Sequence, residues 1–509
     1  MTNHLAEALG LTRTDRAERI FAEIADGRRY TYGEVDAVSN RFAAALLAMG
    51  VAPGDRVAVQ VDKSIEALML YLGAVRAGAV FLPLNTAYTP NEVAFFIEDA
   101  EPALVVCRPA AAEALAPVAT RAGARLETMG VWAADGADHG TLFRHIPDEA
   151  GPVMVARGPD DLAAILYTSG TTGRSKGAML SHDNLASNAL TLVDYWRFTA
   201  ADRLIHALPI YHTHGLFVAS NVTLVAGGSL IWMAKFDLDA VIEALPGATA
   251  MMGVPTFYTR LLTDPRLTPE RCETMRLFVA GSAPLLAETH RQFEAATGHA
   301  ILERYGMTEA SMITSNPYDG ARRAGTVGHP LPGVALRVRD TENGAPMGAG
   351  EIGMLEVRGP NVFKGYWKLP EKTAEELSPE GWFVTGDLAT IGADGYVQIV
   401  GRGKDLIISG GFNVYPKEVE GEIDRLDSVV ESAVIGVPHP DFGEGVVAVV
   451  VPEAGAPRDP EAITAALAER IAKFKQPKRV IFVDALPRNT MGKVQKKALR
   501  EEHAALFGA

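Results

Sequence analysis

A hydroxyl- and glycine-rich stretch at residues 167–182, YTSGTTGRSKGAMLSH, constrains the fold of the chain more than any other segment. Its three glycines let the backbone turn tightly and approach a ligand closely, and its serine and threonine hydroxyls add hydrogen-bond donors to the backbone N–H groups. The apolar run 162–166 that precedes it is predicted to be a short buried strand. We therefore expect a phosphate-binding loop at the end of a strand.

Two common loop motifs fit this stretch less well. A nucleotide triphosphatase P-loop requires Gly-Lys followed by Ser or Thr, whereas Ser175 precedes Lys176 here and Gly177 follows it. Residues 173–177 match the loose G-x-S-x-G pattern of a hydrolase, which would make Ser175 a nucleophile and require no ATP. That motif needs one sharp turn between a strand and a helix, and a hydroxyl-rich loop is a different context.

The whole stretch resembles the signature phosphate loop of the adenylate-forming superfamily, which includes acyl-CoA synthetases, peptide-synthetase adenylation domains and luciferases. Four more segments resemble that superfamily in the same order, and together they cover nearly the whole chain. They are residues 303–309 (ERYGMTE), 383–387 (FVTGD), 401–420, which resembles the hinge region, and 487–493 (PRNTMGK), which resembles the C-terminal lysine loop.

The rest of the chain predicts an α/β fold with more than one domain. At 509 residues it exceeds what one hydrophobic core normally supports. Strands at 55–60 and 79–84 flank a helix at 65–77, a βαβ rhythm that recurs after the phosphate loop. From about residue 325 short strands and turns predict a β subdomain. The predicted domains are an N-terminal AMP-binding and acyl-pocket domain, 1–401, and a small mobile α+β C-terminal domain, 402–509.

Charge and cysteine content narrow the class of partner and compartment. A net charge of −14 argues against a nucleic-acid surface or an anionic membrane as the main partner. Two cysteines build no disulfide framework or metal cluster, which favours the cytoplasm. Residues 204–234 carry no Asp, Glu, Lys or Arg and could span a bilayer, but histidines and a proline favour a buried helix followed by a strand. No carrier domain is expected after Ala509.

The resemblance implies an ATP site built from several segments. The phosphates would be held by Thr168, Ser169, Gly170, Thr171, Thr172, Gly173 and Lys176. The wall beside the adenine and the acyl phosphate would be formed by Gly281, Ser282, Ala283, Glu303, Arg304, Tyr305, Gly306 and Met307. Asp387 and Arg402 would hold the ribose, with a surface salt bridge as the alternative interpretation. Glu309 and Thr171 would hold Mg²⁺, and Thr308 would join them in catalysis.

The C-terminal segments imply a second half-reaction with CoA. By resemblance, Lys493 bridges the substrate carboxylate and the α-phosphate during adenylation, although by itself it could be one more exposed lysine. The domain would then rotate about Lys404, because adenylation needs Lys493 inside and thiolysis needs that space. Ser409, Gly410 and Gly411 would pack against the pantetheine of CoA.

The acid that is activated is predicted from Arg304, because relatives that use aromatic or fatty acids usually have a small residue at this position. A buried guanidinium without an anion is expensive, so Arg304 is expected to face a substrate carboxylate or an internal acid such as Glu303. Arg304, His214 and the Ser282 hydroxyl would form a polar cup for a second carboxylate, and this combination resembles malonyl-CoA synthetases. His212 would lie beside the same carboxylate, with core packing as the alternative interpretation.

The predicted reaction is malonate + ATP + CoA giving malonyl-CoA, AMP and pyrophosphate, with methylmalonate as a second substrate. The alternative enzyme is a synthetase for a coumarate-like or medium-chain acid, with an apolar tunnel and tolerance of Arg304→Gly. A non-catalytic AMP-binding protein should lack Lys493 or Glu309, and both are present.

Overall fold

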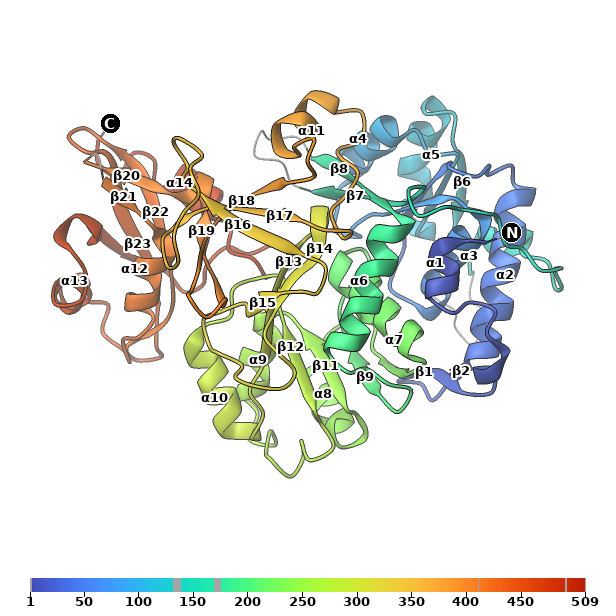
Figure 1. The fold of residues 1–509 in the computed structure, drawn as a ribbon, viewed down its shortest axis with the longest axis horizontal. Coiled ribbons are helices and arrows are strands. Elements are labelled where there is room, and N and C mark those ends of the chain that lie inside the picture. Colours follow the sequence, from blue (N-terminus) through green and yellow to red (C-terminus); the bar gives the residue numbers. More distant parts are fainter. Residues whose placement is uncertain (1, 131–138, 169–174, 411, 490–491, 509) are drawn as a thin grey trace.

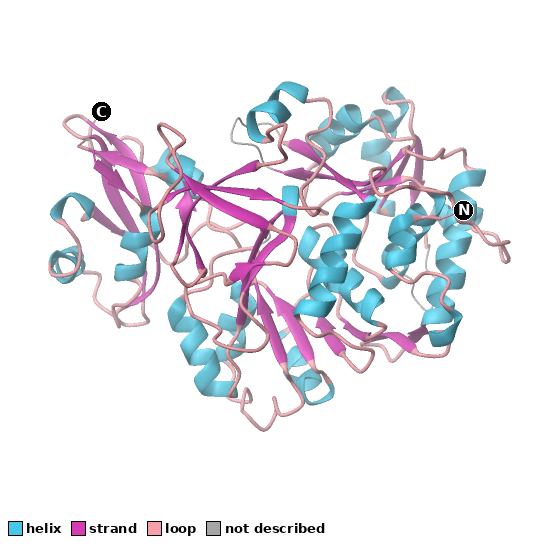
Figure 2. Ribbon diagram, in the orientation of Figure 1, coloured by secondary structure: helices cyan, strands magenta, loops and turns pink. Residues whose placement is uncertain are grey.

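The computed structural model describes residues 2–130, 139–168, 175–410, 412–489 and 492–508. In this part of the chain the elements form a large body and a smaller C-terminal lobe beside it (Figure 1). The large body contains two mixed sheets with helices packed on them and a separate antiparallel sheet (Figure 2). The predicted α/β class with a β subdomain and a small α+β unit is confirmed.

The first sheet carries the predicted phosphate loop. Among the described residues it has six strands in the order β6-β5-β3-β4-β7-β8, parallel except for the pair β7 and β8. Thr168 at the end of β7 lies opposite Lys176 at the start of β8, so the two strands hold both ends of the loop. The strand bounds are β3 Arg56–Gln60, β4 Val80–Pro83, β5 Leu104–Cys107, β6 Arg125–Thr128, β7 Leu162–Thr168 and β8 Lys176–Ser181.

The second sheet supplies the opposite wall of the site. In the described chain it has nine strands in the order β15-β14-β13-β12-β11-β9-β10-β1-β2, with a parallel centre and antiparallel pairs at both ends. The bounds are β1 Ile20–Ile24, β2 Arg29–Thr31, β9 Arg203–His206, β10 Ser229–Trp232, β11 Ala250–Gly253, β12 Leu277–Ala280, β13 Leu302–Met307, β14 Ser311–Ser315 and β15 His329–Pro330.

One helix, α3 (Ile65–Ala77), is buried along its entire length of 13 residues. It is apolar apart from Glu66 and Arg76, whose side chains bond to Tyr30 and Ser39, as expected for a helix enclosed by other elements. It packs on α2 (Tyr32–Ala48), which starts at a capping box of Thr31 and Glu34. On another side Tyr71 contacts Phe217, with ring centroids 5.7 Å apart. α3 is therefore shared by distant parts of one large core.

Other helices of the large body cover the sheets. They are α1 (His4–Ala8), α4 (Pro90–Ala100), α5 (Ala112–Arg121), α6 (His182–Tyr195), α7 (Asn221–Ala226), α8 (Leu238–Ala244), α9 (Pro255–Leu262), α10 (Ala287–Thr297) and α11 (Pro370–Glu376). Residues 204–234 fold as the end of β9, a π-helical turn at His214–Ser220, α7 and β10, which agrees with the predicted helix and strand. Across the described residues, no helix is long and apolar enough to cross a membrane.

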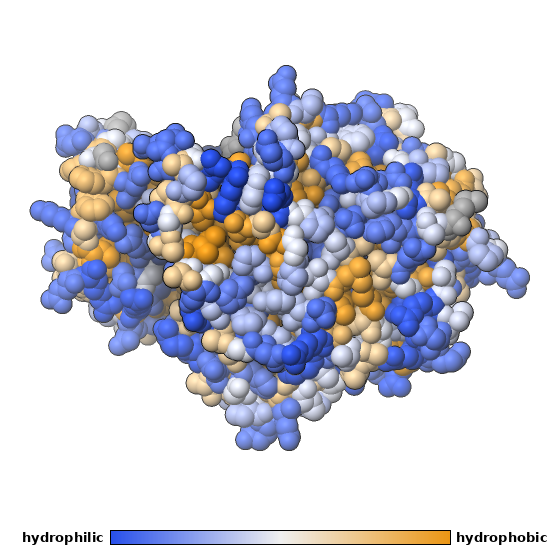
Figure 3. All heavy atoms as spheres, in the orientation of Figure 1, coloured by the Kyte–Doolittle hydropathy of each residue, from blue (hydrophilic) through white to orange (hydrophobic). Residues whose placement is uncertain are grey.

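The β subdomain and the C-terminal lobe complete the fold. The antiparallel sheet β16-β17-β18-β19 comprises Ala335–Arg339, Gly353–Arg358, Phe383–Ile391 and Val397–Arg402. The C-terminal lobe contains β20 Ile407–Ser409, β21 Phe412–Val414, β22 Val429–His439, β23 Gly443–Pro452 and β24 Arg479–Phe482, with α12 Pro416–Ile423, α13 Pro460–Ala468 and α14 Lys496–Glu502. The molecular surface is notched between this lobe and the α11 region (Figure 3).

Candidate active site

Glu309 lies buried directly beside the end of β7. Its carboxylate accepts a hydrogen bond from the Thr168 hydroxyl at 3.2 Å, and the Tyr366 hydroxyl oxygen lies 3.2 Å from it. Burial raises the pKa of Glu309. Glu309 forms no ion pair with a lysine or arginine in the described structure. A buried carboxylate that lacks a cation and stands next to a predicted phosphate loop fits a metal ligand.

Lys176 is already engaged by protein groups. Its ammonium donates to the Glu376 carboxylate at 3.2 Å and stands 4.0 Å from the centre of the Tyr366 ring. The Tyr366 hydroxyl donates to Glu376 at 2.6 Å. Glu376 and Tyr366 are thus members of the site that the sequence analysis missed, because they lie about 200 positions away from Lys176 and no local pattern marks them.

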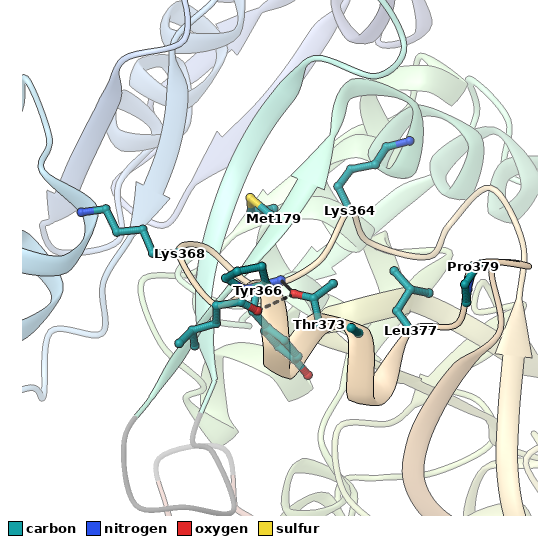
Figure 4. A pocket seen from close by; sticks show the side chains of 10 residues that line it. Met179, Lys364, Tyr366, Lys368, Thr373, Leu377 and Pro379 are labelled. Carbon is teal, nitrogen blue, oxygen red and sulfur yellow. Dashed lines mark hydrogen bonds between the residues drawn. The ribbon is translucent and has the colours of Figure 1, made fainter.

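The same tyrosine lines an open groove of about 580 Å³. Figure 4 shows Tyr366 beside Thr373, with the Tyr366 backbone N–H bonded to the Thr373 hydroxyl, and with Lys364 and Lys368 pointing away from each other. None of the predicted nucleotide or acyl residues lines this groove. The groove adjoins the site through Tyr366, whose hydroxyl bonds to Glu376.

The predicted ribose pair is assembled inside the protein. Asp387 in β18 is buried, and its carboxylate is bonded to the Arg402 Nε at 2.8 Å and accepts the Tyr305 hydroxyl at 2.5 Å. Arg402 also donates to the Thr385 carbonyl at 3.3 Å. This excludes the alternative of a surface salt bridge. We call the residues around the predicted ATP site the nucleotide end: Thr168, Lys176, Tyr305, Glu309, Tyr366, Glu376, Asp387 and Arg402.

Arg304 in β13 is buried, and its guanidinium lies against the backbone of Gly281, where an added Cβ would collide with it. Its Nε and Nη2 atoms have no hydrogen-bond partner among the described residues. Burial lowers the pKa of Arg304 to about 9. Glu303 faces the opposite side of the strand, because successive strand side chains alternate. It accepts the Leu285 N–H at 3.2 Å, so the alternative of an Arg304–Glu303 pair is not seen.

His214, the first residue of the π-helical turn, lies next to Arg304. Its Nδ1 is 3.2 Å from the Ser282 hydroxyl, and its buried Nε2 has no partner in the described chain. Burial, followed by the charge of Arg304, lowers the pKa of His214 well below its usual value. Neutral imidazole and a charged guanidinium can together donate hydrogen bonds to an anion. Arg304, His214, His212 and Ser282 are called the acyl cup.

His212 lies near His214, close enough for the two imidazoles to interact electrostatically. Its buried Nε2 also has no partner among the described residues, and burial lowers the pKa of His212 to about 4. A small pocket is lined by His212 together with Thr308 and parts of β4 and β7. Thr308 begins the short turn that carries Glu309, so this pocket adjoins both ends of the predicted site.

Lys493 comes from the C-terminal lobe but reaches the nucleotide end. Its neighbour Gly492 is so near α9 that an added Cβ would lie 3.3 Å from the Thr256 methyl group. Lys493 is exposed, but the protein groups crowded around it and then the charge of Arg402 lower its pKa, while Asp387 opposes this effect. Lys493 is therefore placed among the residues predicted to bind ATP, as adenylation would require.

Other predicted residues lie around this centre or outside the described residues. Gly281, Ala283, Gly306 and Met307 are in β13 or in the turn after β12. Lys404 is exposed in the turn after β19, Ser409 is buried at the end of β20, and Gly410 bonds to Phe442. Six predicted site residues lie outside the described part of the chain, so their roles stay predictions: Ser169, Gly170, Thr171, Thr172, Gly173 and Gly411.

Family models match most of the chain. The model of the AMP-binding enzyme matches residues 11–367, and that of the AMP-binding enzyme C-terminal domain matches residues 418–493. The predicted boundary between residues 401 and 402 lies between these two matches, which leave it untested.

The chain is also similar to individual proteins. It is 59% identical to ATP-bound MatB from Rhodopseudomonas palustris, with 99% of each chain covered and a TM-score of 0.95. The apo crystal structure of that protein gives a TM-score of 0.86. The chain is 33% identical to a malonate–CoA ligase from Arabidopsis thaliana, covering 94% of this chain and 85% of the relative. A feruloyl-CoA synthase from an Amycolatopsis species is 38% identical, with coverages of 93% and 94%.

Proposed function

Because the chain belongs to the AMP-binding enzyme family, we propose that it is an AMP-forming malonate–CoA ligase that also accepts methylmalonate. It joins malonate to CoA through an acyl adenylate and releases AMP and pyrophosphate. Its small-molecule partners are ATP, malonate and CoA. The cytoplasm is the proposed compartment, and neither nucleic acid nor a membrane is a proposed partner.

The observation that carries the proposal is the buried, unpartnered guanidinium of Arg304. Leaving such a charge without an anion destabilises a protein, and a carboxylate offers two oxygen atoms for its parallel N–H groups. His214 adds a donor from the adjacent turn, since its Nε2 is also buried and unpartnered among the described residues. A substrate with a second carboxylate at its far end satisfies both groups, whereas a monocarboxylic acid leaves them empty.

In the first half-reaction, one malonate carboxylate oxygen attacks the α-phosphorus of ATP, and the bond to the pyrophosphate oxygen breaks. This step brings anions together, so donors that meet the developing charge contribute most to the rate. Lys493 would bridge the attacking carboxylate and the α-phosphate. Asp387 and Arg402 would hold the ribose, and Lys176 would exchange Glu376 for a phosphate oxygen.

Magnesium fits this site at Glu309. Magnesium in nucleotide enzymes is usually held by one or two carboxylates together with substrate phosphates and water, so a lone buried carboxylate suffices. Glu309 would hold the ion with Thr171, and the ion would supply positive charge to the phosphate oxygens. The Thr168 hydroxyl donates to the Glu309 carboxylate and fixes its direction.

In the second half-reaction, the CoA sulfur attacks the malonyl carbonyl carbon and the bond to the AMP oxygen breaks. The space that Lys493 occupies must then be free, and rotation of the C-terminal lobe about Lys404 would remove it. Ser409, Gly410 and Gly411 would then face the pantetheine arm. The higher TM-score against the ATP-bound relative than against its apo form supports an adenylation-like arrangement in the present structure.

Activation of an aromatic acid is the second candidate, because a feruloyl-CoA synthase is among the similar proteins. Its substrate would have to place an apolar ring beside the Arg304 guanidinium and the His214 imidazole. Both would then stay buried without partners, which costs free energy rather than supplying binding. The polar acyl cup therefore favours a dicarboxylate.

The test is AMP formation by purified protein with Mg-ATP and CoA across malonate, methylmalonate, succinate, acetate, octanoate and coumarate. Malonate should be the best substrate. In Arg304→Ala its kcat/KM should fall by about a hundredfold or more, the cost of losing hydrogen bonds to a charged group, while the low rate with acetate stays unchanged. A preference for octanoate or coumarate would contradict the proposal.

A further inference from the structure

Lys63 connects the two large sheets behind the acyl cup. It follows β3 of the first sheet, and its ammonium reaches the carboxyl ends of β9 and β10 in the second. There its Nζ donates to the His206 carbonyl at 2.8 Å, the Met233 carbonyl at 2.6 Å and the His206 Nδ1 at 2.9 Å. None of these three acceptors is a carboxylate. The position of the Lys63 ammonium is therefore set by the fold around it and not by an ion pair.

The three contacts of the Lys63 ammonium show that it acts as a hydrogen-bond donor. The three acceptors match the three N–H groups of an ammonium, and the Trp232 ring adds a cation–π contact at 4.4 Å. Burial lowers the pKa of Lys63, whereas three acceptors on one nitrogen favour the charged form, which alone has three hydrogens to donate. Lys63 is therefore a donor toward His206.

The lysine selects the tautomer of His206. Since Lys63 donates to Nδ1, that nitrogen accepts, and the proton of the neutral ring lies on Nε2. Nε2 lies 2.9 Å from the Gly215 carbonyl, which can only accept, so the same tautomer is required at both ends of the ring. Burial, and then the Lys63 charge, lowers the pKa of His206 well below its usual value, which keeps the ring neutral.

Gly215 is the second residue of the π-helical turn, directly after His214. Its backbone is packed so closely on the Pro209 carbonyl that an added Cβ would collide with it. The Ser220 hydroxyl donates to the same Gly215 carbonyl at 3.0 Å. The bond from His206 therefore anchors the start of the turn, and π-helical turns are often found at functional sites.

We propose that Lys63 is a positioning residue of the acyl cup: through His206 and the Gly215 carbonyl it fixes the turn that presents His214 to the far carboxylate of the acyl substrate. The inference rests on the proposed function and extends it, because it assigns part of the substrate selectivity to a residue that does not touch the substrate. The nucleotide end shares none of these three contacts.

A purely structural role is the competing explanation, since Lys63 also ties two sheets together. Such a role predicts lower thermal stability and equal losses for all substrates. The positioning role predicts a selective loss for malonate, and it predicts that a donor independent of the tautomer can replace the lysine. A glutamine at position 206 carries an amide N–H donor near the place of the imidazole Nε2 and needs no lysine to set its protonation.

The experiment compares Lys63→Met, His206→Gln and the double variant with wild type, and uses Lys364→Met as a matched control from an exposed ion pair with Asp160. KM for malonate should rise at least about tenfold in Lys63→Met, the effect of one weakened hydrogen bond to a charge, with KM for ATP unchanged. The double variant should recover most of that loss. In wild type, ¹⁵N NMR of His206 should show protonation at Nε2.

Thermal unfolding shows whether each variant is folded, and Lys63→Gln, which keeps two uncharged N–H donors, replaces Lys63→Met if the latter does not fold. Three results would overturn this inference and leave the proposed function standing. They are an unchanged KM for malonate in a folded Lys63 variant, equal increases in the KM values for malonate and ATP, and no recovery in the double variant. Wild-type protein that forms no AMP with malonate would overturn the proposed function, and the inference with it.

Discussion

At the nucleotide end, Asp387 is bonded to Arg402 and Lys176 to Glu376, whereas in the acyl cup Arg304 and His214 keep buried nitrogen atoms without partners among the described residues. The nucleotide end has thus paired its arginine and its lysine with protein carboxylates, whereas the acyl cup has left its arginine unpaired among the described residues. The first must exchange partners when a ligand binds. The second gains its first partner then.

This difference indicates which of the two regions can select between substrates. Exchange of one partner for another returns little free energy, because a contact is lost for each contact made. An anion that meets a buried, unpartnered guanidinium gains the full interaction, and a ligand without the anion gains nothing. We therefore expect ATP to be bound modestly and the acid to be selected strongly.

The largest expected effect lies at Lys493, the one predicted donor that arrives from the other lobe. Lys493→Ala should lower the rate of adenylation by two to three orders of magnitude, as expected when a donor to the transition state is deleted. Conversion of preformed malonyl-AMP to malonyl-CoA should continue near the wild-type rate. Separate assays of the half-reactions check this, and an equal loss in both would show that the assigned role is wrong.

Thermal unfolding of two arginine variants tests the comparison directly. Arg402→Met leaves the buried Asp387 carboxylate without its cation and should lower stability by about 3 kcal/mol or more. Arg304→Met removes a buried charge that has no protein partner and should raise stability by about 1 kcal/mol or more. Calorimetry without ligands measures both. Destabilisation by Arg304→Met would mean that Arg304 has an anionic partner in the free protein.

The pH dependence of stability should expose the buried Glu303. Burial raises the pKa of Glu303 to about 8, above its ordinary value of 4.5, so the folded protein holds this proton where the unfolded chain has lost it. Stability from this group is complete below about pH 4.5 and declines as the pH rises toward 8. Glu303→Gln should flatten the decline of the unfolding temperature between pH 5.5 and 8 by several degrees, while Glu288→Gln, on the exposed side of α10, should not.

The smallest effect is expected at Glu376. Glu376→Gln removes the carboxylate that engages Lys176 in the free protein, so the lysine becomes available to phosphate without an exchange of partners. KM for ATP should fall roughly threefold, with KM for malonate unchanged, because a partly exposed pair contributes little. Steady-state kinetics at low salt measure it. A rise in the KM for ATP would instead show that Glu376 orients the lysine.

Local sequence signals predicted local structure well. The helix predicted at 65–77 is α3 at the same residues, because the apolar pattern that specifies a helix acts over a few residues. Arg304 could be singled out as unusual, but the choice between a substrate anion and Glu303 needed the strand alternation that places the two side chains on opposite faces.

Long-range partners could not be predicted in this way. Lys63 meets His206 across 143 positions, and Tyr366 meets Glu309 across 57. Lys63 and Tyr366 have ordinary types in ordinary local patterns, so only the folded arrangement reveals these contacts. The phosphate loop shows the converse case, since its pattern is strong in sequence while residues 169–174 lie outside the described part of the structure.

The enclosed helix α3 has a consequence for synthesis of the protein on the ribosome. Tyr71 of α3 bonds to Asn221, which is translated 150 positions later. A nascent chain that has made α3 must therefore expose an apolar surface until the second half of the large body emerges, and such surfaces promote aggregation. Truncated chains that end between α3 and α7 should need chaperones to stay dispersed.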